Sequence, residues 1–400
     1  MSENSARADW LRLVLTPGVG PSTLNALITA FGSPDQVLGK SEAELSRIPK
    51  ISPKAVKGLL LTGQGKRESE VEAELALLDG KAARILLSSD PDFPPLLREI
   101  PVPPRLLFAR GRLPDPQGPV IAVVGTRRCD SYGLKMTREI VTALAGKGIV
   151  TASGLALGID GAAHRAALAV GGQSWAFLPC GFGSMYPCEH AELAEEIAGT
   201  GGLFTEFHSK IQPHPRCFPV RNRLVSGCAR GVLVVQAPMG SGALITARHA
   251  MEQNRDVYAV PGRANEPPSE GPHRLIQDGA KLVCSAEDIL SELRAFVPAR
   301  PASRHNQPPK RVEPVKTGSE TSARHPEEAL QPPAISSPGM RLPDDPIDRR
   351  IVLRLEAGRT HIDRLAGDLD LPVRKVSERL LLLEMQGLVR RLPGMSFDLA

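Results

Sequence analysis

The chain has 400 residues, of which 42% are hydrophobic and only 4% are aromatic, and its formal net charge at pH 7 is +5. This length suits two to four domains, and the small net charge excludes nucleic-acid binding through a strongly basic bulk field. Any such binding must come from a local patch. The six cysteines have no paired Cys-x-x-Cys spacing, so we expect neither a zinc site nor a disulfide framework. With no signal pattern and no apolar run of about eighteen residues, we expect a cytoplasmic protein without membrane contact.

Residues 1–80 are predicted to form a small helical domain, because residues 8–78 carry apolar side chains at helical spacing. "PGVG" at 17–20 resembles the turn of a helix-hairpin-helix motif, in which backbone N–H groups can hold a DNA phosphate. The second copy, "PKIS" at 49–52, has Lys50 where a glycine is expected. Nine basic residues face ten acidic ones in this domain. We therefore expect a packing or interaction role here rather than DNA contact.

Residues 81–297 are predicted to form an extended Rossmann-like α/β core with a parallel sheet, because apolar strands alternate with helical stretches. The predicted strands are "VIAVVG", "GIVTASG", "SWAFLPCG", "GLFTEF", "GVLVVQAP", "DVYAVPG" and "KLVC". Before them, the proline-rich lead-in at 88–111 disfavours central strands and long helices.

Residues 298–346 are expected to form a flexible linker, because they hold 11 of the 37 prolines and little periodic apolar content. Residues 347–400 follow with three predicted helices and a terminal β-hairpin, the pattern of a winged-helix domain. Its presumed recognition helix, near 373–385, carries Arg374, Lys375 and Arg379. Reading DNA and contacting another protein both stay open for this helix.

The loop "VVGTRR" at 123–128 follows the first core strand and has a lone Gly125. A dinucleotide fold would need G-x-G-x-x-G, so that the pyrophosphate can approach the backbone. Arg127 instead offers a charged fork where a phosphate could lie. No G-x-x-x-x-G-K-[ST] motif occurs either. We therefore expect no NAD, FAD or other cofactor and no P-loop nucleotide site.

Two further loops are predicted to open helices on the same side of the sheet. In "SGLALGIDGAAH" at 153–164, Asp160 is interpreted as a helix N-cap rather than a catalytic carboxylate, and His164 as structural. In "MGSGALITARHA" at 239–250, Ser241 and Gly242 begin a helix whose free N–H groups could hold an anion. Plain capping by Ser241 is equally compatible with this pattern.

The stretch "HPRCFPVRNRLVSG" at 214–227 is predicted to begin a helix at Pro219 and to place Arg221 and Arg223 at the rim of the crevice. We expect phosphates to bind Arg127, Arg216, Arg221 and Arg223, and Phe218 to stack a base. The alternative is that these arginines pair with acids distant in the sequence.

Taken together, these motifs resemble the DNA-processing protein DprA (Smf) family. "VVGTRR", "SGLALGIDGAAH", "FPVRNRLVSG", "SGALITA" and "VPG" follow in that family's order and spacing. The resemblance implies a core that binds single-stranded DNA without sequence preference, forms a homodimer, and loads the recombinase RecA during natural transformation. The family's strand pocket carries over onto Arg127, Phe218, Arg221, Asn222 and Arg223. Arg216 lies beside the family's basic position, and His273 stands where the family usually has an asparagine.

We therefore predict a non-enzymatic recombination mediator. A rival reading is a nucleotide-processing hydrolase of the lysine-decarboxylase-like Rossmann group, with Glu189 as the best catalytic candidate. That group's P-G-G-x-G-T-x-x-E hallmark is missing, and "PCGFGSMYPCE" at 179–189 is only a loose echo of it. A transcriptional regulator acting through the winged helix is disfavoured, because it would not require the arginine-rich crevice.

Overall fold

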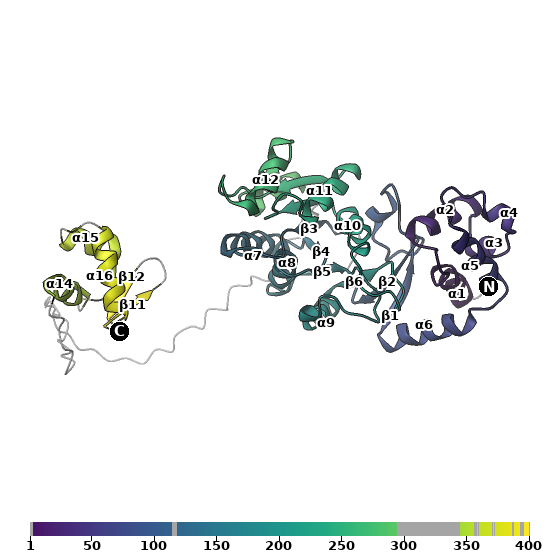
Figure 1. Ribbon diagram of the computed structural model, residues 1–400, viewed down its shortest axis with the longest axis horizontal. Helices are drawn as coiled ribbons and strands as arrows, with labels where there is room; N and C mark the ends of the chain where they lie inside the picture. Colours follow the sequence, from purple (N-terminus) through teal and green to yellow (C-terminus); the bar gives the residue numbers. More distant parts are fainter. Residues whose placement is uncertain are drawn as a thin grey trace, which may run out of the picture. The chain divides into compact units, whose positions relative to one another are not determined.

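A computed structural model describes residues 3–113, 118–293 and 345–399, the last with gaps at 356–357, 359, 370, 372, 386–387 and 393–395. The chain divides into two compact units after Asn306, the first carrying the helical N-terminal part and the sheet (Figure 1). The predicted linker at 298–346 lies outside the described residues except for its last two positions. Among the described helices, none is long and apolar enough to cross a membrane.

The N-terminal part is helical, as predicted. Its helices are α1 (Glu3–Val14), α2 (Pro21–Phe31), α3 (Pro34–Leu38), α4 (Glu42–Leu45), α5 (Pro53–Gly63) and α6 (Glu68–Gly80). Local chemistry explains several of their ends. Ser41 and Glu44 form a capping box at α4, and Ser52 caps α5 ahead of Pro53.

A mixed sheet follows, and in the described part of the first unit it has nine strands in the order β1-β2-β6-β5-β4-β3-β7-β8-β9. The strands are β1 (Ala83–Leu87), β2 (Leu106–Gly111), β3 (Val120–Val124), β4 (Val150–Ser153), β5 (Ser174–Phe177), β6 (Gly202–Thr205), β7 (Gly231–Val234), β8 (Asp256–Ala259) and β9 (Lys281–Leu282). All pairs from β6 to β9 are parallel, whereas β1–β2 and β2–β6 are antiparallel. The predicted extended α/β core is confirmed.

One sequence-based expectation fails in the lead-in segment. β2 lies between β1 and β6 and is buried along Leu106–Ala109, although proline-rich sequence was expected to exclude an internal strand here. The prolines end at Pro104, so the strand begins only after the last of them. Because β2 pairs on both sides, it extends the parallel sheet towards the N-terminal helices.

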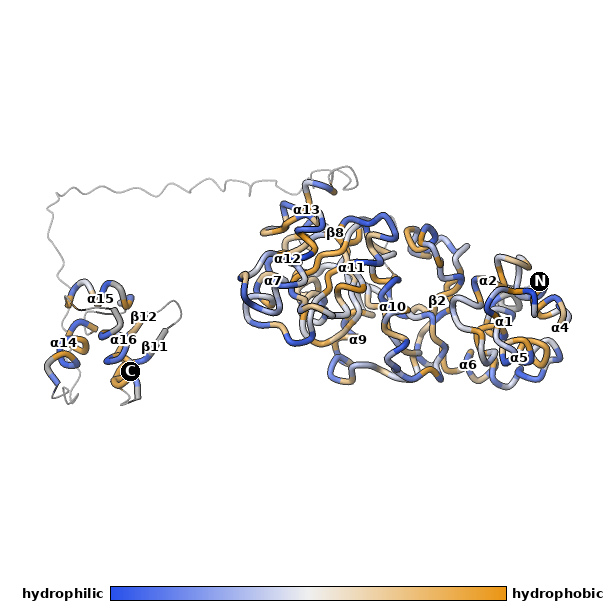
Figure 2. The backbone as a smooth tube through the Cα atoms, turned by 45° about the horizontal axis from the view of Figure 1, so that its top comes forward, coloured by the Kyte–Doolittle hydropathy of each residue, from blue (hydrophilic) through white to orange (hydrophobic). Residues whose placement is uncertain are grey.

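Helices cover both faces of the sheet (Figure 1). They are α7 (Ser131–Gly146), α8 (Ile159–Leu168), α9 (Ala191–Thr200), α10 (Cys217–Gly227), α11 (Gly242–Glu252), α12 (Pro267–Gln277) and α13 (Ala286–Leu293), with 3-10 turns at Pro95–Arg98 and Cys188–His190. Buried on both faces, the middle strands read as continuous apolar runs such as "VIAVV" in β3. Hydrophobic residues therefore concentrate along the strands inside the unit (Figure 2).

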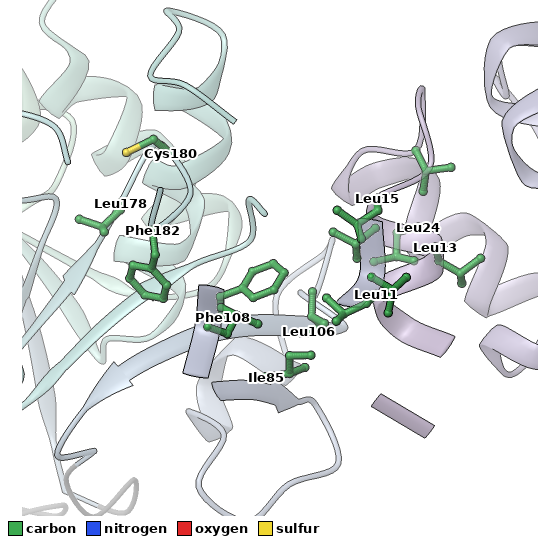
Figure 3. Close-up of a cluster of buried hydrophobic side chains, with 14 of the residues drawn as sticks. Leu11, Leu13, Leu15, Leu24, Ile85, Leu106, Phe108, Leu178, Cys180 and Phe182 are labelled. Carbon is green, nitrogen blue, oxygen red and sulfur yellow. The ribbon is translucent and has the colours of Figure 1, made fainter. Parts of the chain in front are cut away.

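The N-terminal helices share a hydrophobic core with the sheet. Figure 3 shows this cluster, which runs from Leu11 and Leu24 through Ile85 and Phe108 to Leu178. Polar contacts reinforce the junction, since the Arg105 guanidinium donates to Asn25 Oδ1 at 2.7 Å and to Thr29 Oγ1 at 3.0 Å. The domain boundary that we predict at residue 80 thus falls between elements that pack on a common core.

The second unit has the helices and terminal hairpin expected of a winged helix. Its elements are α14 (Pro346–Leu355), β10 (Thr360–His361), α15 (Ile362–Leu369), α16 (Val373–Met385), β11 (Val389–Leu392) and β12 (Ser396–Leu399). On α16, the Arg379 side chain is paired with Asp345 and Asp348 of the same unit, whereas Lys375 is exposed. Arg379 is therefore engaged in holding its own unit together.

Candidate nucleic-acid interface

A crevice opens where the strand order reverses. The chain adds β4, β5 and β6 on one side of β3, and then returns to add β7, β8 and β9 on the other. In open α/β sheets, ligands bind beyond the carboxyl ends of the strands at such a switch point. A cavity of about 410 Å³ lies there, lined by the loops after β3, β4 and β7 and by α10. The fold thus supplies a binding position before any side chain is considered.

The loop after β3 is held in place by Gln236, which lies two residues after the end of β7. The Thr126 N–H donates to the Gln236 carbonyl at 2.6 Å, and the Gln236 side-chain amide donates to Asp130 Oδ1 at 2.9 Å. Asp130 in turn caps α7 by accepting from the Gly133 N–H. These bonds fix the backbone that carries Arg127 and Arg128 at the mouth of the cavity.

Arg127 and Phe218 form the polar and aromatic parts of the mouth. The Arg127 guanidinium carbon lies 5.2 Å from the centre of the Phe218 ring, within the range of a cation–π contact. Tyr186 and Phe218 form an edge-to-face pair, with ring centres 5.6 Å apart. Arg127 has no carboxylate partner among the described residues, so its charge is available to an anion.

Arg221 lines the cavity but is buried, contrary to the expectation that it rims the crevice. Its guanidinium donates to the Gly154 and Phe177 carbonyls and, through Nε, to Asn222 Oδ1. Burial lowers its pKa to about 10, opposed by nearby Asp160, so the group stays charged at neutral pH. A Cβ on Gly154 would overlap the guanidinium, which explains the glycine at this position. Arg221 therefore supplies positive potential from the floor of the cavity.

Arg223 does not face the cavity at all. Its Nη2 lies 2.5 Å from Glu206 Oε2, and Nη1 donates to the Val102 carbonyl at 2.8 Å. The side chains of Arg223 and Glu206 are only 12% and 5% exposed. The expected position of Arg223 at the rim is thus wrong, because its guanidinium forms a buried ion pair with Glu206, which is distant in the sequence.

The remaining predicted residues divide between the cavity and its surroundings. Asn222 lines the cavity and donates through Nδ2 to the Gly242 carbonyl at 3.3 Å. Ser241 caps α11 by accepting from the Ala243 N–H, and Ser241 and Gly242 both line the cavity. Arg216 is exposed at the N-cap of α10, outside the lining. The helix begins at Cys217, so Pro219 is its third residue rather than its first.

Asp160 and His164 both make hydrogen bonds within the fold, and Asp160 is not the N-cap of α8. The N-cap is Gly158, whose φ of +78° is unfavourable for other residues. A side chain at this position would also place its Cβ against the Thr126 carbonyl oxygen. Asp160 accepts from the Gly154 and Ala156 N–H groups and so ties down the loop after β4. His164 is fully buried, with Nδ1 2.7 Å from Ser174 Oγ.

The structure adds two lining residues that the sequence reasoning passed over. Arg128 is exposed, and its side chain has no partner within the described chain. Met239 is 59% exposed at the turn before α11. The sequence does point to both residues, because Arg128 follows Arg127 and Met239 lies two residues before Ser241 in loops that it already predicts to line the crevice. Within the described ranges, no group of three His, Cys, Asp or Glu side chains could hold a metal ion.

The fold and the crevice together define an open α/β protein with a cationic, aromatic-edged cavity at its switch point, preceded in the sequence by a helical part and followed by a winged helix. Residues 84–294 match the family described as DNA recombination-mediator protein A. Residues 330–395 match the DprA winged helix domain, and residues 12–62 match the SAM-like helix-hairpin-helix tandem.

Whole-chain comparisons agree with these matches. Protein Smf of Synechocystis is 33% identical over 412 residues, covering 99% of each chain. DNA processing protein DprA of Streptococcus pneumoniae is 43% identical over 203 residues, covering 51% of this chain and 72% of that one. The X-ray structure of the pneumococcal DprA aligns with a TM-score of 0.62 at 32% identity, over 71% of this chain and 97% of that chain. The chain belongs to the DNA recombination-mediator protein A (DprA/Smf) family.

Proposed function

We propose that this chain binds single-stranded DNA without sequence preference in the crevice at the end of β3. The observation that carries the proposal is the Arg127–Phe218 pair, a charged guanidinium with no acid partner in the described chain, lying against an aromatic ring. Phosphates would bind Arg127, with exposed Arg128 and the N-terminus of α11 beside it. A base would stack on Phe218.

The size and chemistry of the site favour a single strand. A cavity of about 410 Å³ is suited to small groups, and the bases of a duplex are stacked inside and out of reach of Phe218. Stacking on an aromatic ring tolerates every base, because each has a π-face. Binding should therefore depend on phosphates and on stacking, with little preference for sequence.

Arg221 and Arg223 take indirect parts in this proposal. Buried Arg221 lends positive potential to the cavity, while Arg223 anchors α10 through Glu206. Asn222 holds α10 against the first residue of α11. Arg216 lies outside the cavity lining and would contact a strand that leaves the crevice.

We further propose that the chain acts as a homodimeric recombination mediator that loads RecA onto the bound strand during natural transformation. This part rests on membership of a family described as recombination mediators, and on relatives named DNA processing proteins. The rival hydrolase reading gains little support. Glu189 is exposed outside the cavity lining, and the Asp160 carboxylate already accepts backbone N–H groups.

The test is fluorescence anisotropy with labelled oligo(dT) across a salt titration from about 50 to 200 mM, where phosphate-driven affinity falls steeply. We expect Arg127→Ala to weaken binding about tenfold and to reduce the salt slope by about one. Phe218→Ala should weaken binding by roughly five- to 150-fold, as expected from stacking worth about 1–3 kcal/mol, with the salt slope unchanged. Arg138→Ala, an exposed arginine on α7 outside the lining, is the matched control.

Equal affinities of Arg127→Ala and Arg138→Ala for oligo(dT) would refute the assignment of the crevice. The mediator role has its own readout, which is the rate of RecA filament assembly on a strand already coated with single-strand-binding protein. No acceleration by the full chain would contradict the RecA proposal while leaving the strand site intact.

A further inference from the structure

One surface segment of the N-terminal part is strongly basic, although the part as a whole is nearly neutral. Residues 47–67 hold six lysines and arginines and no acidic residue. The acids that balance them lie outside this segment, notably along α6. Averaging over the domain therefore hides a local concentration of positive charge.

The structure gathers four of these residues around the start of α5. Lys54 and Lys57 are exposed and lie three residues apart, so they project from neighbouring positions on one helix face. Lys50 is exposed in the preceding turn, and Arg47 is exposed just after α4. Within the described chain, no ion pair or side-chain hydrogen bond engages any of these four side chains. We call this group the α5 basic face.

The opposite face of α5 is occupied by core packing. Val56 and Leu59 are buried, and the neighbouring Gly58 lies close against Thr16 and Pro17 of the first hairpin turn. The α5 helix is therefore fixed in rotation, because a turn about its axis would expose the apolar face. The lysines are held towards solvent for the same reason.

The first hairpin turn, residues 17–20, has no basic side chain of its own. It lines a cavity of about 470 Å³ together with Leu106 and Phe207. Glu70 and Glu206 line the same cavity, so it also contains carboxylates. These carboxylates disfavour a phosphate at this turn. The turn that fits the helix-hairpin-helix pattern better thus offers an anion less positive charge than the α5 basic face.

We propose that the α5 basic face binds the phosphate backbone of double-stranded DNA. Charge complementarity identifies a polyanion, because exposed lysines without acid partners gain most from phosphates and from the counterions that phosphates release. The segment 47–67 contains no aromatic residue on which an unpaired base could stack. Phosphate contact without stacking fits a duplex better than a single strand.

This site is separate from the crevice proposed for single-stranded DNA. In both views α5 lies at one end of the first unit and α7 at the other, with the sheet between them (Figures 1 and 2). The two sites can therefore be tested independently, with a different nucleic acid reporting on each.

The experiment measures binding of the full chain to a labelled duplex and to oligo(dT) of equal length. The variant is Lys54→Ala/Lys57→Ala, in which alanine keeps high helix propensity. The matched control is Lys135→Ala/Lys147→Ala, two exposed lysines at α7. We expect the α5 variant to bind the duplex about five- to tenfold more weakly for each lysine, with a salt slope smaller by about two. Its affinity for oligo(dT) should stay unchanged.

Lys50→Gly separates charge from folding. Lys50 has a φ of +62°, a conformation that glycine adopts more readily, so this change should preserve or raise the midpoint of thermal unfolding while weakening duplex binding. Duplex affinity equal to that of the control variant would overturn the proposal, as would an equal loss for oligo(dT). If Arg127→Ala leaves oligo(dT) binding intact, only the crevice assignment fails, because the duplex measurement does not depend on it.

Discussion

Removing the Arg223 guanidinium should destabilise the first unit rather than simply weaken DNA binding. The Arg223 and Glu206 side chains are 12% and 5% exposed and 2.5 Å apart, so Arg223→Ala leaves a buried carboxylate without its partner. Breaking such a pair typically costs about 3–5 kcal/mol. The Val102 carbonyl also loses a hydrogen-bond donor.

The free-energy change predicts a measurable shift in thermal unfolding. At roughly 2–4 °C for each kcal/mol in a large domain, 3–5 kcal/mol lowers the midpoint by about 6–20 °C. Burial raises the pKa of Glu206 against the opposing effect of Arg223, so without Arg223 the carboxyl has a stronger tendency to stay protonated. Adding Glu206→Gln to Arg223→Ala removes the unpaired charge and should recover part of the loss.

The assay is calorimetry at neutral pH on the wild type, Arg223→Ala, Glu206→Gln and the double variant. We expect the double variant to be more stable than Arg223→Ala alone, because the cost comes from the buried charge. A midpoint for Arg223→Ala within about 2 °C of the wild type, or strictly additive effects, would refute the reasoning.

Three further predictions follow from the same unit. Burial lowers the pKa of His164 to about 3 from an ordinary value of 6.5, so its contribution to stability is complete above pH 6.5 and is lost as the pH falls towards 3. In urea unfolding, the stability of the wild type relative to His164→Leu should therefore fall by about 1.4 kcal/mol for each pH unit in that window. A stability difference that stays constant with pH would contradict this prediction. Gly158→Ala places a Cβ in steric overlap with the Thr126 carbonyl oxygen at a φ of +78°. The change should lower stability by more than about 1 kcal/mol and weaken oligo(dT) binding. Unchanged stability and binding would contradict this prediction. Ser241→Ala removes the cap of α11 and should lower the free energy of unfolding in urea by about 0.5–2 kcal/mol. Ser241→Asp should retain stability but weaken oligo(dT) binding through charge repulsion. Equal oligo(dT) binding by the two variants would argue against an anion at this helix end.

The sheet was predictable where the sequence carries its own signal. The strands from β3 to β9 are each predicted by the sequence, because apolar runs, most of them ending in Gly, Ser or Pro, are a local property of the chain. The Ser241 cap, one of the two interpretations that the sequence leaves open for this helix start, rests on the same kind of local signal. By contrast, β2 was hidden by prolines that end just before it, since a strand needs only the residues inside it to be free of proline.

The roles of the arginines could not be predicted, because they depend on tertiary partners. Glu206 lies 17 residues from Arg223 in sequence, and Gly154 lies 67 residues from Arg221. Helical periodicity places a side chain on a face but does not say which acid or carbonyl the fold brings to it. Arg127 was easier to place, since it follows directly after a buried strand at the switch point.

The apolar cluster shared by the N-terminal helices and the sheet has a consequence for any shortened form of the protein. A fragment starting at residue 81 would uncover part of the sheet face that carries Ile85, Leu106 and Phe108, and a large exposed apolar patch invites aggregation. The helices thus protect an apolar face of the sheet as well as carrying a surface of their own. Evolutionary loss of this N-terminal segment would require compensating polar substitutions along β1 and β2.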